Sequence, residues 1–494
     1  MNKWRRMIAV AAWCVAGSAV AQGLATRVLP PAVAPGRAVQ PYVRVPAGRI
    51  ALAHVRLIDA TGAPPRDDVT VVLDGARIAA VQPAAAALPA GVTVMDMTGR
   101  TVLPGLVGLH DHMYYIGRPD LDAQGHSEPP LVVPQMTFTS PRLYLAAGVT
   151  TLRTTGSVEP YTDLNLKRQI DAGEIPGPHM DVTGPYLEGA NSPFIQMHQL
   201  TDADDARRTV AFWADQGVTS FKAYMNITRA ELAAAIGEVH RRGLKITGHL
   251  CSVTYPEAAA LGIDDLEHGF FVNTQADPGK LPDRCPTGNG TPTLAGMTPG
   301  SPAATALIAD LVRRHVAITS TLPVFEQQVA LHAPLQTRVM EVLTPEAREA
   351  YLYARNARAT RPNAQFEQAW RNDLGLERQF VAAGGLLLAG PDPTGNGGVV
   401  PGFGDQREVE LLVEAGFSPV EAIRIATLNG ATYLGLADRI GTIAPGKNAD
   451  LVVVRGDPAT RIADIEEVEI TFRDGVGYDS AKLIASVKGR YGEY

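Results

Sequence analysis

The sequence contains few cysteines and no extended basic segment, and both shortages limit what the protein can be. Three cysteines among 494 residues are too few for a disulfide-framework scaffold. Lys and Arg number 44 against 51 Asp and Glu, without a long basic run, so the sequence gives no expectation of a nucleic-acid partner. Charged residues make up 19% and hydrophobic residues 46%, which supports a large core and excludes general disorder.

Long apolar runs are also lacking beyond the N-terminal segment. There, a positively charged start precedes the apolar run 7–15, and small residues follow at 19–21. This order is typical of a secretory signal, so we expect residues 1–21 to be removed and the mature chain to begin at Gln22. The run is too short to span a bilayer comfortably. The sequence therefore predicts a periplasmic or secreted protein without a membrane span.

Cleavage at that point would leave two cysteines, Cys251 and Cys285. In an oxidising compartment a disulfide between them is one interpretation. Two separate buried thiols are the other. The sequence leaves both open.

Short strand patterns mark the two ends of the mature chain. Residues 22–48 are rich in Ala, Pro and Val without a period, which is typical of an extended arm. Residues 49–102 contain four strand patterns, with an Asp74-Gly75 hairpin signal between two of them. Strand patterns return within residues 435–494. Because each end has too few strands to bury a face alone, we expect both to join in one small β-sandwich domain.

Between these ends, residues 103–434 alternate strand patterns with helix patterns. The eight strand-like runs are 107–112, 149–153, 179–183, 219–224, 245–249, 265–268, 316–321 and 386–389. Eight strands that alternate with helices predict an α/β fold of the (β/α)8 TIM barrel type. Active sites of such barrels lie at the C-terminal ends of the strands, so long connections such as 270–302 are candidate lids and substrate walls.

Four histidines stand where predicted barrel strands end. His110 and His112 belong to the first strand, in which alternate side chains face the same side, so both can bind one metal ion. His249 and His268 end two successive strands, 19 residues apart. A single H-x-H pattern is more often structural. Two further histidines on neighbouring strands favour a metal site.

A carboxylate and a lysine complete this set. Asp392 follows the last barrel strand and can bind metal and accept a proton, although its flanking prolines also suit an Asp-Pro turn. Lys222 ends the fourth strand and faces inward together with Tyr224. A lysine aimed into a barrel is costly unless it is paired or modified. Carboxylation by CO2 would convert it to N6-carboxylysine, an anionic carbamate able to bridge two cations.

Together these residues resemble the amidohydrolase superfamily of metal-dependent hydrolases, in its imidazolonepropionase- and prolidase-like branch. The resemblance extends from about residue 50 to about 454, with specific motifs at 103–106 and 441–451. It implies two divalent cations, most often zinc. By resemblance, the buried ion would be bound by His110, His112 and Asp392, the second by His249 and His268, and both by carboxylated Lys222.

Three positions depart from the family pattern. Val107-Gly108 stands where an acidic residue is common, Pro391 stands where Thr is frequent, and Arg153-Thr154 stands where Arg-Asp is common. None of these changes removes a ligand, so we expect them to affect the substrate rather than the metal chemistry.

The resemblance implies a secreted amidohydrolase that cleaves a peptide-like, N-acyl amino acid or aryl amide bond, with dipeptidase- or carboxypeptidase-like specificity. A metal-bridging hydroxide would attack the carbonyl, and Asp392 would act as general base and then acid. A lactonase or ester hydrolase with the same site is the alternative, and a non-catalytic barrel scaffold is another. Candidate contacts to the small-molecule substrate are Tyr224, His198 and Arg153. Related enzymes often form homo-oligomers.

Overall fold

The computed structural model describes residues 23–492 except for residues 25, 116–130, 193 and 395–397. The predicted signal segment, residues 1–21, lies outside the described residues. Among the helices that the structure describes, none combines the length and the apolar character needed to cross a membrane.

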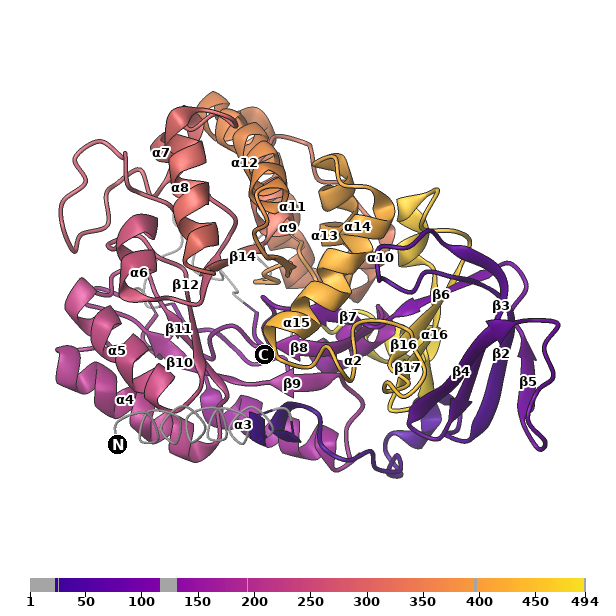
Figure 1. Ribbon diagram of the computed structural model, residues 1–494. Helices are drawn as coiled ribbons and strands as arrows, with labels where there is room; N and C mark the ends of the chain where they lie inside the picture. The colour runs from indigo at the N-terminus through magenta and orange to yellow at the C-terminus, as the bar shows by residue number, and fades with distance from the viewer. Residues whose placement is uncertain (1–22, 25, 116–130, 193, 395–397, 493–494) are drawn as a thin grey trace, which may run out of the picture.

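The centre of the molecule is an α/β fold with two parallel sheets and helices packed outside them (Figure 1). One sheet has the order β7-β8-β9, and the other has the order β10-β11-β12-β13-β14-β15. The strands are β7 (Leu106–Gly108), β8 (Val149–Arg153), β9 (His179–Asp181), β10 (Thr183–Leu187), β11 (Ser220–Ala223), β12 (Lys245–Gly248), β13 (Asp265–Glu267), β14 (Ala317–Ser320) and β15 (Leu387–Ala389). The predicted strand 179–183 is therefore divided at Val182 between the two sheets.

Backbone hydrogen bonds connect the two parallel sheets. Leu109 N, just after β7, donates to Ala389 O of β15 over 2.8 Å. Ser157 N, just after β8, donates to Gly184 O of β10 over 3.1 Å. The carboxyl ends of strands from both sheets are thereby brought to one side of the molecule.

The first central strand is shorter than predicted. It ends at Gly108, so the prediction that His110 and His112 lie in a strand over 107–112 is wrong. Residues 109–112 bend away because their backbone is held from both sides: Asp392 N donates to His110 O, and Asp111 N donates to Arg153 O. Tertiary hydrogen bonds, and not strand alternation, therefore place the two histidines.

Helices begin directly after several strands because their first residues carry capping signals. In α5 (Arg229–Arg241) Thr228 accepts from the Glu231 backbone while Glu231 accepts from the Thr228 backbone. Thr254 and Glu257 make the same capping box at α6 (Tyr255–Leu261). Such reciprocal caps satisfy amide groups that the first helical turn leaves unpaired.

The remaining helices surround the sheets. Those on the outer layer are α2 (Thr139–Ala146), α3 (Pro160–Asp171), α4 (Ala203–Gln216), α8 (Pro302–Arg313), α12 (Ala364–Ala382), α13 (Phe403–Glu414), α14 (Pro419–Arg424) and α15 (Gly430–Tyr433). Four lie in the long connections: α7 (Thr291–Gly296), α9 (Leu322–Glu326), α10 (Thr337–Val342) and α11 (Pro345–Thr360). A π-helical turn, Ile425–Asn429, lies between α14 and α15.

Strands from both ends of the chain form a nine-stranded sheet beside the parallel sheets (Figure 1). Its order is β1-β18-β17-β16-β6-β2-β3-β4, and β5 pairs with β2. The strands are β1 (Val43–Val45), β2 (Arg49–Leu57), β3 (Arg66–Asp74), β4 (Arg77–Pro83), β5 (Thr93–Asp96), β6 (Arg100–Pro104), β16 (Leu451–Arg455), β17 (Val468–Arg473) and β18 (Val476–Asp479). The last helix, α16 (Ser480–Val487), follows β18.

Two details of this sheet test the sequence predictions. The hairpin at Asp74-Gly75 is confirmed, since β3 and β4 pair from Asp74 opposite Arg77. The arm is not irregular to its end, because β1 and a short 3-10 helix, Gln40–Tyr42, lie within residues 22–48. β1 pairs with β18, and this pairing supplies the hydrogen bonds that an isolated arm would lack.

Candidate metal centre

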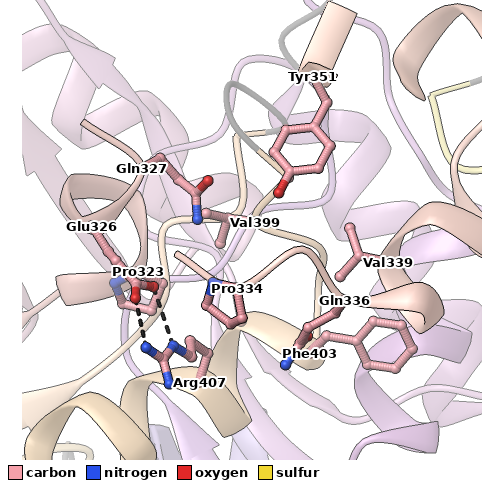
Figure 2. A pocket seen from close by; sticks show the side chains of 12 residues that line it. Pro323, Glu326, Gln327, Pro334, Gln336, Val339, Tyr351, Val399, Phe403 and Arg407 are labelled. Carbon is pink, nitrogen blue, oxygen red and sulfur yellow. Dashed lines mark hydrogen bonds and ion pairs between the residues drawn. The ribbon is translucent and has the colours of Figure 1, made fainter. Parts of the chain in front are cut away.

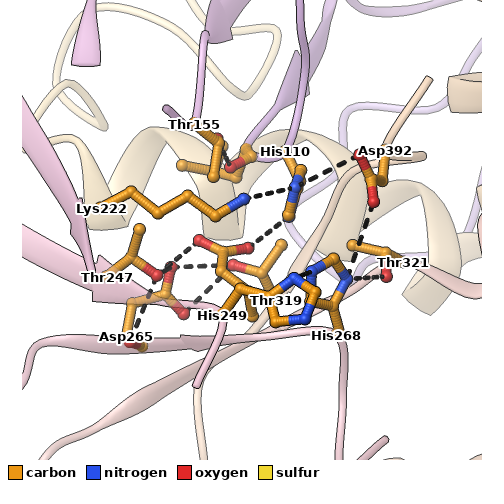
Figure 3. Close-up of polar contacts among 12 residues, drawn as sticks. His110, Thr155, Lys222, Thr247, His249, Asp265, His268, Thr319, Thr321 and Asp392 are labelled. Atoms are coloured by element: carbon orange, nitrogen blue, oxygen red, sulfur yellow. Dashed lines mark hydrogen bonds and ion pairs between the residues drawn. The ribbon is translucent and has the colours of Figure 1, made fainter. Parts of the chain in front are cut away.

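All six predicted ligands converge at the carboxyl ends of the central strands. Figure 3 shows Lys222, His110, Asp392, His249 and His268 around a common centre. Three of the group, His110, His112 and Asp392, each offer one ligand atom within 4.8 Å of the others. Side chains that lie far apart in sequence are thus brought together by the bend after β7 and by the segment after β15.

Asp392 places its carboxylate beside the Nε2 atoms of the first two histidines. Its Oδ1 lies 3.1 Å from His112 Nε2 and 3.5 Å from His110 Nε2. Asp392 adopts a left-handed backbone conformation with φ of 52°. This conformation is costly for a non-glycine residue and persists where the surrounding structure imposes it. The bend directs the carboxylate toward the histidines.

The ring nitrogens that face away from the centre are already hydrogen bonded. His110 Nδ1 donates to Glu267 Oε2 over 2.6 Å, and His112 Nδ1 donates to the Thr154 carbonyl over 3.2 Å. In metal sites a ligating histidine commonly uses its second nitrogen in this way, which fixes the ring and its tautomer. The Nε2 atoms of His110 and His112 are left facing the centre.

His249 and His268 form the other side of the group. His268 Nε2 and His249 Nδ1 lie 2.8 Å apart, while Thr321 Oγ1 lies 2.8 Å from His268 Nδ1. His249 Nδ1 and His268 Nε2 thus face each other, and Thr321 fixes the His268 ring. Lys222 Nζ lies 3.0 Å from His110 Nε2.

Burial sets the charge of these side chains. Desolvation lowers the pKa of His110 and His112 and lowers that of His249 to about 3, so these imidazoles are neutral. Burial opposes ionisation of Asp392, but its interactions with His110 and His112 outweigh burial and hold the pKa of Asp392 below its usual range. Neutral imidazoles and an ionised carboxylate are the forms that bind divalent metals.

Lys222 is the one cation of the group. It is 1% exposed, and desolvation lowers the pKa of its ammonium group to about 8. A neutral amine is the form that can react with CO2 to give a carbamate. The donor set of imidazole nitrogens and carboxylate oxygens, with buried Asp392 Oδ1 and His249 Nε2 lacking hydrogen-bond partners, fits divalent metal ions.

The three predicted substrate contacts lie in different surroundings. Tyr224 lines the cavity above the centre. His198 is exposed and pairs with Asp205 at 2.9 Å. Arg153 is buried below the centre, where its Nη2 donates to Asp265 Oδ2 over 2.8 Å and to Glu267 Oε1 over 2.9 Å. Only Tyr224 of these three is among the described residues that line the cavity.

Several residues near the site were not singled out from the sequence. Glu267 accepts a hydrogen bond from His110. Its position directly before His268 was the one feature of the sequence that could have indicated a place near the site. Tyr114 stands two residues after His112, and its hydroxyl lies 2.5 Å from that of Tyr186. No pattern in the sequence links Tyr114 to Tyr186, because they belong to different connections.

The cavity above the centre has a volume of about 310 Å³. This volume is at the lower end of the range for small-molecule sites. His112, Lys222, His249, His268 and Asp392 all contribute to its lining. The candidate ligands therefore face a space that a small substrate can enter.

A second hollow lies nearby on the other side of α9 (Figure 2). Its volume is only about 30 Å³, which is room for little more than a water molecule. Glu326 and Arg407 pair there, with Arg407 Nη2 2.6 Å from Glu326 Oε1 and Nε 3.2 Å from Oε2. The ion pair of Glu326 and Arg407 anchors α9, and the hollow is too small for a substrate.

Another buried group with metal-ligand chemistry joins the central strands to the nine-stranded sheet. It comprises His179 of β9, Asp450 before β16 and Asp474 between β17 and β18. His179 Nε2 lies 3.1 Å from Asp474 Oδ2, and Asp474 N donates to Asp450 Oδ1 over 2.6 Å. Arg473 lies beside Asp474, so a cation is already present at this group.

Comparison with known proteins relates both the sequence and the fold to hydrolases. A family model described as the amidohydrolase family matches residues 403–476. An adenine deaminase of Ligilactobacillus salivarius is 43% identical over 67 residues, which is 14% of this chain and 11% of the deaminase. The chain thus matches about a tenth of the length of this curated relative.

Solved structures resemble the chain over most of its length. A Xaa-Pro dipeptidase with methionine bound in its active site has a TM-score of 0.64 at 17% identity and covers 87% of this chain and 100% of its own. The ochratoxinase of A. niger has a TM-score of 0.62 at 16% identity and covers 87% of this chain and 95% of its own. At these identities the likeness concerns the fold. The chain is therefore similar to the amidohydrolase family over residues 403–476, and its fold resembles that of the dipeptidase and ochratoxinase structures.

Proposed function

We propose that this chain is a binuclear metal-dependent hydrolase that cleaves an amide bond of a small molecule. The observation that carries the proposal is the convergence of four neutral imidazoles, one ionised carboxylate and one buried lysine on one centre, beside a cavity of about 310 Å³ that all of them except His110 line. Two divalent ions bound there, most simply zinc, would activate water and polarise the carbonyl.

The ligands divide into two pairs bridged by one lysine. His110 and His112 with Asp392 would hold one ion, and His249 with His268 the other. Lys222 lies beside His110, and as a carbamate it would serve as a ligand shared by the two ions. The lowered pKa of Lys222, about 8, keeps a fraction of its amine neutral at pH 7 and so available to CO2.

Asp392 is placed to move the proton. It is ionised, borders the cavity and lies 3.1 Å from His112 Nε2. It would take a proton from the attacking water and return it to the leaving nitrogen. Tyr224 borders the same cavity, and burial raises its phenol pKa above its usual value, so its hydroxyl stays protonated and can donate to the substrate carbonyl.

The two parallel sheets are joined by backbone hydrogen bonds at two places. We propose that β7 to β15 form one closed (β/α)8 barrel, with β9 and β10 counted as one interrupted strand. The hydrogen bonds from Leu109 to Ala389 and from Ser157 to Gly184 support this closure. The nine-stranded sheet would be the predicted sandwich domain, folded over its own apolar core.

We also propose that the enzyme acts outside the cytoplasm. The structure joins Cys251 and Cys285 in a disulfide, and disulfides persist mainly in oxidising compartments. Assembly into a homo-oligomer is a further part of the proposal, based on the resemblance alone. Size-exclusion chromatography with light scattering would measure it.

The test uses the purified protein loaded with zinc and a panel of amides, N-acyl amino acids, dipeptides and lactones. We expect about two equivalents of metal per chain and hydrolysis of at least one amide. Protein without stoichiometric divalent metal would contradict the proposal. Cleavage of lactones alone would replace the amidase assignment with a lactonase.

The carbamate is tested with Lys222→Ala. Removing the bridging group should lower both the metal content and the activity, the latter at least 100-fold, since it deletes a shared ligand. The exposed lysine variant Lys488→Ala is the matched control and should behave like the wild type. Full metal content and full activity of Lys222→Ala in CO2-free buffer would exclude the bridging carbamate.

A further inference from the structure

The cavity above the metal centre has one wall made of phenylalanine rings. Phe271, Phe325 and Phe366 all line it. Phe271 and Phe325 are stacked, with ring centroids 3.9 Å apart and planes 3° from parallel. Phe325 also makes an edge contact with the His268 ring at 5.5 Å. An aromatic surface therefore begins directly beside a candidate metal ligand.

The position of this wall is fixed from behind. Phe325 belongs to α9 and lines the cavity, while the next residue, Glu326, lines the small second hollow (Figure 2). Glu326 is fully buried and makes a two-bond ion pair with Arg407 and a 2.8 Å contact with His332. These contacts of Glu326 hold α9 and therefore Phe325 in place. A ring that is already held loses little conformational freedom when a ligand binds, which favours affinity.

A second part of the cavity lining is also mostly apolar. Tyr114, Val133, Val158 and Tyr186 form one buried cluster, against which Phe194, Met197 and Tyr224 pack. All seven line the cavity. The hydroxyl pair of Tyr114 and Tyr186 is satisfied internally at 2.5 Å, so the rings, rather than free polar groups, face a ligand. The cavity therefore suits apolar groups on both sides of the bond to be cleaved.

Charged partners for a substrate are scarce in this cavity. Among the described residues that line it, Lys222 is the only cation and Asp392 the only anion. Lys222 contacts His110, and Asp392 contacts His112. A substrate carboxylate placed against the phenylalanine or tyrosine rings, away from the proposed metal ions, would lose its hydration without gaining a counter-charge from a side chain there, and such desolvation is costly.

We propose, on the basis of the proposed amide hydrolysis, that the substrate is an uncharged amide with an aromatic group beside Phe325 and a second apolar group against the tyrosine wall. Phe325 is then a specificity-determining residue, and Arg407 is a positioning residue that holds it through Glu326. Dipeptides and N-acyl amino acids with a free carboxylate are poor substrates under this proposal.

The test compares two amides that differ by one charge. N-benzylbenzamide is uncharged and has a ring on each side of a single amide bond, and 4-(benzamidomethyl)benzoate adds one carboxylate. With zinc-loaded wild-type protein we expect kcat/KM for the uncharged amide to be at least 10-fold higher. Equal values, or preference for the carboxylate, would overturn the proposal.

Two variants locate the selectivity. Phe325→Ala should lower kcat/KM for N-benzylbenzamide about 10- to 100-fold, because a buried ring contact is lost, while the metal content stays at the wild-type level. The matched control is Phe212→Ala, whose half-exposed side chain lies on α4 and does not line the cavity. Arg407→Gln should raise KM more than it lowers kcat, since it loosens the wall without touching the ligands. Unchanged kinetics in Phe325→Ala would refute the role of this ring.

Binding separates this proposal from the proposed reaction. If neither amide is hydrolysed, the reaction proposal fails, and calorimetric titration with the same two amides decides the cavity proposal. Tighter binding of the uncharged amide, weakened at least 10-fold in Phe325→Ala, supports it. Equal binding of both amides, or binding unaffected by Phe325→Ala, overturns it.

Discussion

Glu267 controls how His110 faces the candidate metal centre. Its Oε2 accepts from His110 Nδ1 over 2.6 Å, and its Oε1 accepts from Arg153 over 2.9 Å and from the Thr247 hydroxyl. The carboxylate is therefore held on both sides, and it can hold the imidazole in turn. A charged acceptor at Nδ1 raises the basicity of the nitrogen that would bind metal.

Glu267→Gln keeps an acceptor but removes the charge. We expect the affinity of the buried metal position to fall about 10-fold, which is the usual size of such effects. Competition with a chromophoric chelator measures the affinity, and circular dichroism checks the fold. Glu349→Gln, at an exposed position, is the control. If the Glu267→Gln affinity equals that of wild type, Glu267 does not tune the site.

Asp163 links protonation to stability. It is 1% exposed and accepts from the Ser157 hydroxyl over 2.5 Å, yet burial raises its pKa from 3.8 to about 7. The folded state then holds a proton that the unfolded chain releases near pH 4. The contribution of Asp163 to the free energy of unfolding therefore decreases as the pH rises from about 4 to 7, and it is constant above pH 7.

Asp163→Asn removes this titration while keeping an acceptor for Ser157. Relative to wild type, the variant should gain roughly 1 kcal/mol of unfolding free energy per pH unit between pH 5 and 7, and nothing more above pH 7. Urea unfolding at pH 5, 6, 7 and 8 measures the difference. Asp438→Asn, at an exposed aspartate, should show no such trend. A constant difference across these pH values would mean that Asp163 is ionised throughout.

The residues of the candidate centre were predictable because each ends a predicted strand or follows one. His249, His268 and Lys222 are placed by strands whose bounds the sequence predicted within one or two residues. His110 and His112 converge with them although their strand ends earlier than predicted. Phe325 and Tyr186 were not predictable, since their place in the cavity depends on contacts between separate connections.

At the scale of elements, buried charges connect β9 to the nine-stranded sheet. His179 of β9 lies 3.1 Å from Asp474, in the turn between β17 and β18. Asp474 has a φ of 51°, and its backbone N–H donates to Asp450. Burial, together with the charge of Asp474, raises the pKa of Asp450 to about 6. The contacts are internal to the protein, and each of the three side chains is almost fully buried.

Asp474→Asn tests this connection without straining the turn, because asparagine tolerates a left-handed backbone. Removing one charge leaves its partners buried and uncompensated, which costs about 3 kcal/mol in comparable pairs. Denaturant unfolding measures this loss, and Asp74→Asn at an exposed turn is the control. Metal content should remain that of wild type. A drop of one metal equivalent would instead identify the group of His179, Asp450 and Asp474 as a metal site.

Element bounds show where local signals suffice. The helices α4 and α6 begin and end at local signals in the sequence, because Asp202 and Thr254 cap their first turns and Gly217 and Gly262 end them. The strand at residue 43 was missed, since β1 has only three residues and exists through its pairing with β18. This pairing depends on residues at the other end of the chain, so the residues around position 43 alone could not predict the strand.

At the scale of the whole molecule, the two ends of the chain form one sheet and the middle forms the site. β6 and β16 are more than 340 residues apart in sequence and pair directly, from Arg100 opposite Arg455 to Pro104 opposite Leu451. The strand patterns predicted this arrangement only in outline. Each end of the chain has too few strands to bury a face alone, so the strands of the two ends were expected to pair. The order of the strands within the sheet required the structure.

The disulfide ties a long connection to the central strands. Cys251 follows β12, and Cys285 lies 34 residues later in the connection that carries Asn289 and Thr291 to the cavity. Closing a loop of this length restricts the unfolded chain, and such bonds contribute about 3–4 kcal/mol. The bond therefore supports both the stability of the protein and the shape of one cavity edge.

The double variant with Cys251→Ser and Cys285→Ser should lose about 3 kcal/mol of unfolding free energy and should be insensitive to reductant. Wild-type protein treated with reductant should match it. Because Asn289 and Thr291 are then less restrained, KM should rise more than kcat falls. Metal content should stay unchanged, because His268, the proposed ligand inside the closed loop, directly follows β13 and is held by Thr321. Stability that is equal with and without reductant would mean that the bond does not constrain the chain, and the cavity edge would then depend on Asp277, which accepts from Gly290 N and Thr293 N over 2.9 Å and 3.0 Å.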